Sequence, residues 1–142
     1  MKFYADAGPA GIFARTGEMP SAIMEKVGMK ASEMILRRTA KGVDVNGQSF
    51  RPYHPDYAEY RKDKGRRVDI VDLNFTGKMY ASLTHDVISE NEVMLYFAGD
   101  PQAEKAQHNN PKRQFFALSQ EEMDELAELI GADWVEYVLE QA

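Results

Sequence analysis

The clearest pattern of apolar and polar positions is a stripe with helical spacing that follows Pro20. Its apolar members recur every three or four residues: Ile23, Val27, Ala31 and Met34. This spacing places them on one face of an α-helix. Pro20 suits the first helical position and Gly42 suits the residue that ends the helix. The pattern predicts one long amphipathic helix between them.

Two neighbouring segments have the composition of strands. "HDVISE" (85–90) and "EVMLYFAG" (92–99) flank Asn91 and predict a β-hairpin. The second segment is almost entirely apolar, which is typical of a central, buried strand. Near the N-terminus, "FYAD" (3–6) is short enough for an edge strand, and the rest of residues 1–17 carries little pattern.

The C-terminal quarter begins with a helix-start signal. Ser119 and Glu122 have the spacing of a capping box, in which each side chain bonds the other residue's backbone N–H. An apolar face follows: Met123, Leu126, Ala127 and Ile130. We expect Gly131 to break this helix, and one or two amphipathic turns to follow around Trp134, Val135, Val138 and Leu139.

The segment 42–72 is polar and basic, and we expect an extended loop arm. Asn46-Gly47 predicts a tight turn, and Pro52 and Pro55 disfavour regular structure around them. A short helical turn is expected over 56–64. Beyond the arm, Thr76 is placed to cap a short helix with Met79, Tyr80 and Leu83 on its inner face. Residues 103–110 begin with a helical pattern and then fray.

Together these elements predict a single domain, 1–142, of the α+β class. A long N-terminal helix and C-terminal helices would pack on a small antiparallel sheet. The residues expected in the core are Leu73, Met79, Leu95, Phe97, Phe115 and Leu118.

Length and composition fit one soluble domain. The chain has 142 residues, and 44% of them are hydrophobic. It has no cysteine, so a disulfide framework and a thiolate metal site are excluded. The absence of cysteine is compatible with a reducing compartment. No apolar run approaches the ~20 residues that span a bilayer, and the N-terminus lacks a signal-peptide pattern. We expect a protein made and used in a cytoplasm, without a membrane.

Charge is distributed unevenly along the chain. The net charge is −6, yet residues 37–67 hold nine Lys/Arg and four acids, so this segment is +5 and the remainder is −11. Residues 119–142 hold eight acids and no Lys or Arg. Such asymmetry bears on association rather than on fold. Either the two segments pack together within one chain, or the basic segment of one subunit meets the acidic helix of another.

Known site motifs do not fit. "DVNGQS" resembles a calcium loop, but Gly47 falls two places early and Pro55 stands where a ligating Glu is needed. "TGKM" (76–79) lacks the upstream glycine of a phosphate loop. The three histidines share no ligand spacing, and no residue set indicates a nucleophile or a cofactor: His54, His85 and His108. We expect no enzyme, no metal and no cofactor. Basic residues alternate with aromatic residues in 37–67, and this pattern leaves DNA binding open as an alternative function.

Four motifs in order resemble the phage virion morphogenesis family of tail-completion and neck proteins, including those of Mu-like phages. They are a glycine-rich stretch ending in F-x-P-Y, a Tyr-x-x-x-Arg step, an L-x-x-T-G-x-M segment, and R-x-F-F-x-L-S before an acidic helix. The matching positions are Gly42, Asp44, Gly47, Phe50, Pro52, Tyr53, Tyr57, Arg61, Leu73, Thr76, Gly77, Met79, Arg113, Phe115, Phe116, Leu118 and Ser119. The match covers about residues 20–130.

The resemblance implies a structural protein that completes the tail or joins head to tail. It implies a ring of subunits, six in number, around the channel through which DNA passes, with other tail and neck proteins as partners. It implies a place in the virion after assembly in the host cytoplasm.

We therefore expect the arm to dock between subunits or rings. Its expected contact residues are Arg51, Tyr53, Tyr57, Arg61, Arg66 and Arg67. An arm of this kind would be loose in an isolated subunit and would become ordered on assembly.

Overall fold

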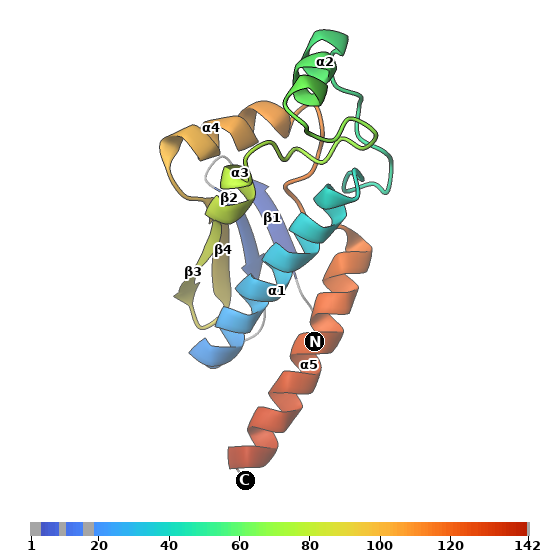
Figure 1. Cartoon of the computed structure of the whole chain (residues 1–142). Helices are drawn as coiled ribbons and strands as arrows, with labels where there is room; N and C mark the ends of the chain where they lie inside the picture. The colour runs from blue at the N-terminus through green and yellow to red at the C-terminus, as the bar shows by residue number, and fades with distance from the viewer. Residues whose placement is uncertain (1–3, 9–10, 16–18, 142) are drawn as a thin grey trace.

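The computed structural model describes residues 4–8, 11–15 and 19–141, and it has the expected α+β fold. Two long helices pack with an antiparallel sheet (Figure 1). Two shorter helices and the arm lie at one end of the molecule (Figure 1). The strands are β1 (Tyr4–Gly8), β2 (Gly11–Arg15), β3 (Leu83–Ser89) and β4 (Glu92–Phe97). The helices are α1 (Ser21–Ala40), α2 (Pro55–Asp63), α3 (Lys78–Ser82), α4 (Asp100–Asn109) and α5 (Gln120–Gln141).

The sheet has four strands in the order β1-β2-β4-β3. The hairpin at Asn91 and the central position of β4 are confirmed, since β4 pairs with β3 on one side and β2 on the other. The edge strand near the N-terminus is also confirmed as β1, although Phe3 lies outside the described residues. Strand β2 was not predicted. Its five residues are too few to show the alternation of apolar and polar positions that marks a strand.

Helix α1 follows the predicted stripe. Its buried side chains include Ile23, Val27 and Met34, and it packs on the β3–β4 side of the sheet. Pro20 is not the first helical residue but lies one position earlier, at the N-cap. Gly42 ends the helix with φ +73°, a left-handed conformation that a glycine adopts without steric cost.

Helix α5 differs from the prediction. The capping box is confirmed, because Glu122 N donates to Ser119 Oγ at 3.1 Å and Ser119 N donates to Glu122 Oε2 at 2.9 Å. Gly131 does not break the helix, which continues to Gln141. Trp134 and Tyr137 beyond it pack against the core, and this contact offsets the ~1 kcal/mol preference against helical glycine.

The short elements also differ in their boundaries. Helix α3 begins after Gly77 (φ +81°) rather than after Thr76, whose hydroxyl accepts from Lys78 N at 3.3 Å. Leu83 is the first residue of β3 instead of the end of this helix. Helix α4 begins at Asp100, earlier than expected, and α2 matches the helical turn expected within the arm.

The core forms two adjoining clusters. The larger joins α1, β4 and α5, and includes Leu95 and Leu118. The smaller lies under the arm and includes Phe50, Met79 and Phe115, with Leu73 partly buried at its margin. Five of the six predicted core residues are therefore confirmed as buried, and Leu73 is only partly buried. The second cluster fastens the segments before and after α2.

Candidate docking groove

The base of the arm is tied to the segment before α5. The tight turn at Asn46-Gly47 is confirmed, with Gly47 at φ +81° and Val43 bridged to Ser49. Val45 N donates to Gln114 O at 2.9 Å, and the ring of Phe50 is buried in the smaller core cluster. The arm therefore leaves the domain from a fixed base.

Arg113 holds the next part of the arm through its backbone. Its Nε donates to Arg51 O at 2.9 Å and its Nη2 donates to Pro52 O at 3.1 Å. The guanidinium carbon lies 5.2 Å from the centre of the Tyr53 ring. Partial burial lowers the pKa of Arg113, the effect expected for a cation removed from water.

Arg61, the last-turn arginine of α2, is buried. Only 1% of it is exposed. Its Nε donates to Arg67 O at 2.9 Å, and its Nη2 donates to Asp72 Oδ1 at 3.2 Å and Asn74 O at 3.0 Å. We expected Arg61 to contact another subunit. In this structure its Nε and Nη2 are engaged in the hydrogen bonds that close the loop between α2 and α3.

Tyr53 and Tyr80 secure that loop from the domain side. Leu73 N donates to the Tyr53 hydroxyl at 3.1 Å, and the Tyr80 hydroxyl donates to Asp72 O. Burial raises the pKa of both phenols. Leu73 has φ +55°, and a left-handed leucine costs about 1–2 kcal/mol. Such a conformation persists only where surrounding contacts determine it.

These contacts argue against an arm that is loose in the isolated subunit. The buried guanidinium of Arg61 joins α2 to the loop that follows it. Hydrogen bonds of two phenol groups join that loop to Tyr53 and Tyr80. The geometry favours instead an arm that its aromatic residues pin to the domain.

A row of aromatic rings runs along the arm. Tyr53 and Tyr57 meet edge to face at 5.2 Å, Tyr57 and Tyr60 stack at 6.2 Å, and Tyr60 stacks on Phe75 at 5.7 Å with 12° between the planes. Arg66 lies 5.2 Å from the Phe75 ring centre. Tyr57 and Tyr60 remain exposed, so the middle of the row lies at the surface.

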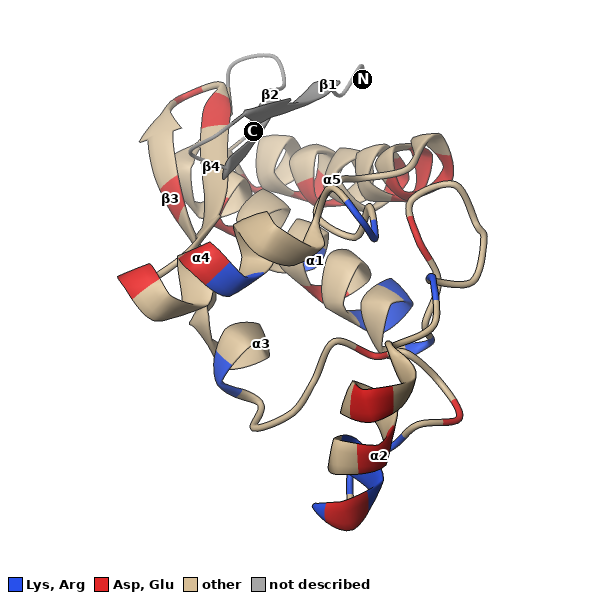
Figure 2. Cartoon of the chain, turned by 90° about the horizontal axis from the view of Figure 1, so that it is seen from above, with Lys and Arg blue, Asp and Glu red and all other residues tan. Residues whose placement is uncertain are grey.

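A groove of about 900 Å³ lies between this row and helices α3 and α4. Figure 2 shows the arrangement of α2, α3 and α4. Its cationic lining comes from two separate segments: Arg51 and Arg61 from the arm, and Lys105, Lys112 and Arg113 from α4 and the loop after it. His54 and His108 also line it. No Asp or Glu lines the groove among the residues described, although the chain as a whole is acidic. The groove can therefore accept an anionic partner that also has apolar surface.

The structure brings together only some of the predicted contact residues. Arg51, Tyr53 and Tyr57 line the groove, with Arg61 beneath them. Arg66 and Arg67 lie outside it, and Arg67 pairs with Asp69 at 3.1 Å. This hydrogen bond raises the pKa of Arg67 and lowers that of Asp69.

Sequence reasoning missed the other wall of the groove. The missed residues are Gln102, Lys105, His108, Lys112 and Arg113. A signal was present, since "EKAQHNNPKR" (104–113) holds three Lys/Arg and one acid. Its proximity to the arm depends on the fold, because the two segments are about 50 residues apart in sequence.

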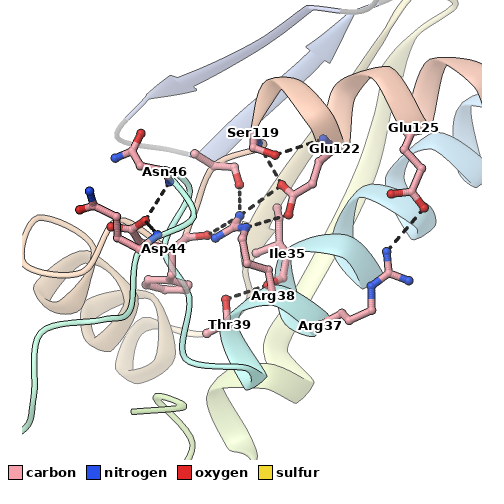
Figure 3. Close-up of polar contacts among 12 residues, drawn as sticks. Ile35, Arg37, Arg38, Thr39, Asp44, Asn46, Ser119, Glu122 and Glu125 are labelled. Carbon is pink, nitrogen blue, oxygen red and sulfur yellow. Dashed lines mark hydrogen bonds and ion pairs between the residues drawn. The ribbon is translucent and has the colours of Figure 1, made fainter. Parts of the chain in front are cut away.

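At the opposite side of the arm base, basic α1 meets acidic α5. Arg38 Nε donates to Glu122 Oε1 at 2.7 Å, and its Nη2 donates to Ala117 O and Phe115 O (Figure 3). Arg37 lies 3.7 Å from Glu125. Part of the charge asymmetry is therefore resolved within one chain, while the arm and groove cations lie away from α5.

The histidines occupy three different places. His54 caps α2 by accepting from Asp56 N at 3.2 Å, His85 on β3 pairs with Glu25, and His108 on α4 lies beside Lys112. Within residues 4–8, 11–15 and 19–141, no group of three His, Asp or Glu side chains could hold a metal ion. In the same part of the chain, no helix has the length and apolar character of a membrane span.

Comparison of the chain with protein-family models, curated proteins and solved structures finds no match. The resemblance to the virion morphogenesis family thus rests on motifs alone. Several of the motif positions have a clear structural role. Three are glycines with positive φ: Gly42, Gly47 and Gly77. Four are buried: Phe50, Met79, Phe115 and Leu118. Tyr53, Arg61 and Arg113 make the contacts described above.

Proposed function

We propose that this chain is a non-enzymatic assembly protein of a tailed phage or prophage, acting in tail completion or head–tail joining as a ring of like subunits. Its place would be the tail or neck of the virion, reached after assembly in the host cytoplasm. Other tail or neck proteins would be its partners.

The observation that carries the proposal is the pinned arm and the groove it forms. Three of the positions that resemble the family's motifs fasten the arm: Arg113 on its backbone, Arg61 within it, and Tyr53 on the loop after it. A cation-lined groove on a chain of net charge −6 suits a protein that recognises an acidic protein surface. A ring requires one face of a subunit to meet a different face of the next.

The first test is the solution mass, measured by light scattering over a concentration series with and without short duplex DNA. A discrete oligomer formed without DNA supports the proposal. A monomer under both conditions contradicts spontaneous ring formation and leaves only assembly templated by another virion protein.

A second candidate is a DNA-binding accessory domain that uses the basic aromatic segment 37–67. The exposed rings of Tyr57 and Tyr60 beside the groove favour it, because aromatic rings stack on bases. In this case a mass shift would occur only with DNA. Its affinity would fall by about one log unit per log unit of salt for each phosphate neutralised.

A further inference from the structure

The C-terminal half of α5 carries an apolar stripe on its solvent side. Val135, Val138 and Leu139 are exposed, with 68% of Leu139 accessible. Their spacing places them on one face of the helix. A different face, with Ile130, Trp134 and Tyr137, packs against the core. A single exposed leucine is ordinary, but three neighbouring apolar side chains on one helix face indicate a contact surface.

Acidic side chains flank this stripe. Glu136 and Glu140 lie beside it, and neither has a cation within ion-pair distance in the described part of the chain. Asp133, one turn earlier, is already paired with Lys26 at 3.6 Å. The end of α5 thus presents apolar and anionic groups together, with no Lys or Arg from residue 119 onward.

The groove has the complementary character. Lys105 and Lys112 line it from one wall, and Arg51 lines it from the other. No carboxylate among the described residues is paired with any of these three cations. The exposed ring of Tyr57 and the half-buried ring of Phe75 supply apolar surface between the two walls.

One chain cannot bring these two surfaces together. Figure 1 places α2 and the arm at one end of the molecule and the C-terminal end of α5 at the other, past the start of α1. Helix α5 is held along α1 by the Arg38–Glu122 and Lys26–Asp133 pairs. A contact between the surfaces must therefore join two copies.

We propose that residues 133–141 of α5 of one copy dock in the groove of the next copy. Val138 and Leu139 lie against the aromatic wall, and Glu136 and Glu140 face Lys105 and Lys112. The contact is head to tail, so its repetition closes a ring or extends a filament. This inference rests on the proposed function, for which it names the contact between subunits. Nucleic acid in the groove would leave the apolar stripe of α5 without a partner, and for this reason we favour a second copy of the chain.

Cysteine crosslinking tests the contact directly, because the chain has no native cysteine. One preparation carries Lys105→Cys and the other carries Val138→Cys; both side chains are exposed. The mixed preparation, treated with a short bifunctional thiol reagent, should give a crosslinked dimer. The control replaces Val138→Cys with Met29→Cys, an exposed position on α1. The control pair should give at least about tenfold less crosslinked dimer than the test pair, because a specific contact of even modest affinity raises the yield by this factor.

Charge reversal provides an independent test. Glu136→Lys/Glu140→Lys should weaken self-association by at least about tenfold, because like charges then face each other. Lys105→Glu/Lys112→Glu should do the same, and a mixture of the two variants should restore association. Lys62→Glu/Lys64→Glu changes the same charge on the arm but outside the groove, and it should have no effect.

The outcomes separate the inference from the proposed function. If the wild-type chain forms a discrete oligomer but the Lys105→Cys and Val138→Cys pair crosslinks no better than the control, the inference is wrong and the assembly function stands. If the wild-type chain is monomeric at every concentration and does not crosslink, the inference is wrong and ring formation by this chain alone is contradicted as well.

Discussion

The imidazole of His85 on β3 occupies the space that a side chain at Gly28 of α1 would need. A Cβ atom at position 28 would lie 2.4 Å from Cγ and Cδ2 of the ring and 2.9 Å from its Cβ. The ring is held in place because its Nε2 lies 2.7 Å from Oε2 of Glu25, which is on α1 one turn before Gly28. Close approach of α1 to the sheet therefore depends on a glycine in the middle of a long helix.

Gly28→Ala should destabilise the protein. Alanine favours a helix by ~1 kcal/mol over glycine, but overpacking a core contact costs about 1–3 kcal/mol, so the net change is a loss of up to about 2 kcal/mol. Gly131→Ala is the matched control, because no described atom lies within 4 Å of its Cβ position and it should stabilise α5 by ~0.5–1 kcal/mol. Urea unfolding measures both. A gain in stability for both variants would show that the ring of His85 moves aside.

Arg38 and Arg37 are adjacent but should differ strongly on substitution. The Arg38–Glu122 pair has side chains 10% and 12% exposed, whereas those of Arg37 and Glu125 are 58% and 49% exposed. Arg38→Ala removes the cation paired with Glu122 and the donor to two carbonyls, and should lower the free energy of unfolding by ~3–5 kcal/mol. Arg37→Ala should change it by ~0–1 kcal/mol. Equal effects in denaturant titrations would contradict a structural role for the Arg38 network.

Arg61→Ala should release the arm without unfolding the domain. The substitution removes the donor to Arg67 O, Asp72 and Asn74 O, while the larger core cluster is untouched. We expect hydrogen exchange over residues 53–75 to become faster and exchange in α1 to stay unchanged. Lys62→Ala, an exposed neighbour on α2, should leave the exchange of both segments as in the wild type. Unchanged exchange in the Arg61 variant would mean that other contacts suffice to hold the arm.

Alkaline pH should destabilise the attachment of the arm. Burial raises the pKa of Tyr53 and Tyr80 in the folded chain above the value of about 10 expected in the unfolded chain. Their contribution to stability is therefore complete below pH 10 and is lost as the pH rises through the folded-state values. Ultraviolet absorbance of the phenolate should show a component above pH 10 that is smaller in Tyr80→Phe. Titration of all the phenols near pH 10 in the folded protein would contradict this assignment.

Local and periodic features were predictable from the sequence. The apolar stripe of α1, the turn at Asn46-Gly47 and the capping box at Ser119 each depend on residues within a few positions of one another. The α+β class followed from the order of such elements. The groove was half predictable, because the arm has a distinctive composition while its second wall is a short basic stretch of α4 and the loop after it.

Tertiary contacts decided the remainder. Gly131 stays helical because Trp134 and Tyr137 find core surface beyond it, and β2 is a strand because β1 and β4 pair with it on both sides. Arg61 has the appearance of a surface cation in its basic segment, yet it is buried because Asp72 and the carbonyls of Arg67 and Asn74 converge on it. The sequence by itself determined which segments are helical and where charge resides. Burial and pairing across long sequence separations, which only the folded chain defines, determined which of those charges remain free to meet a partner.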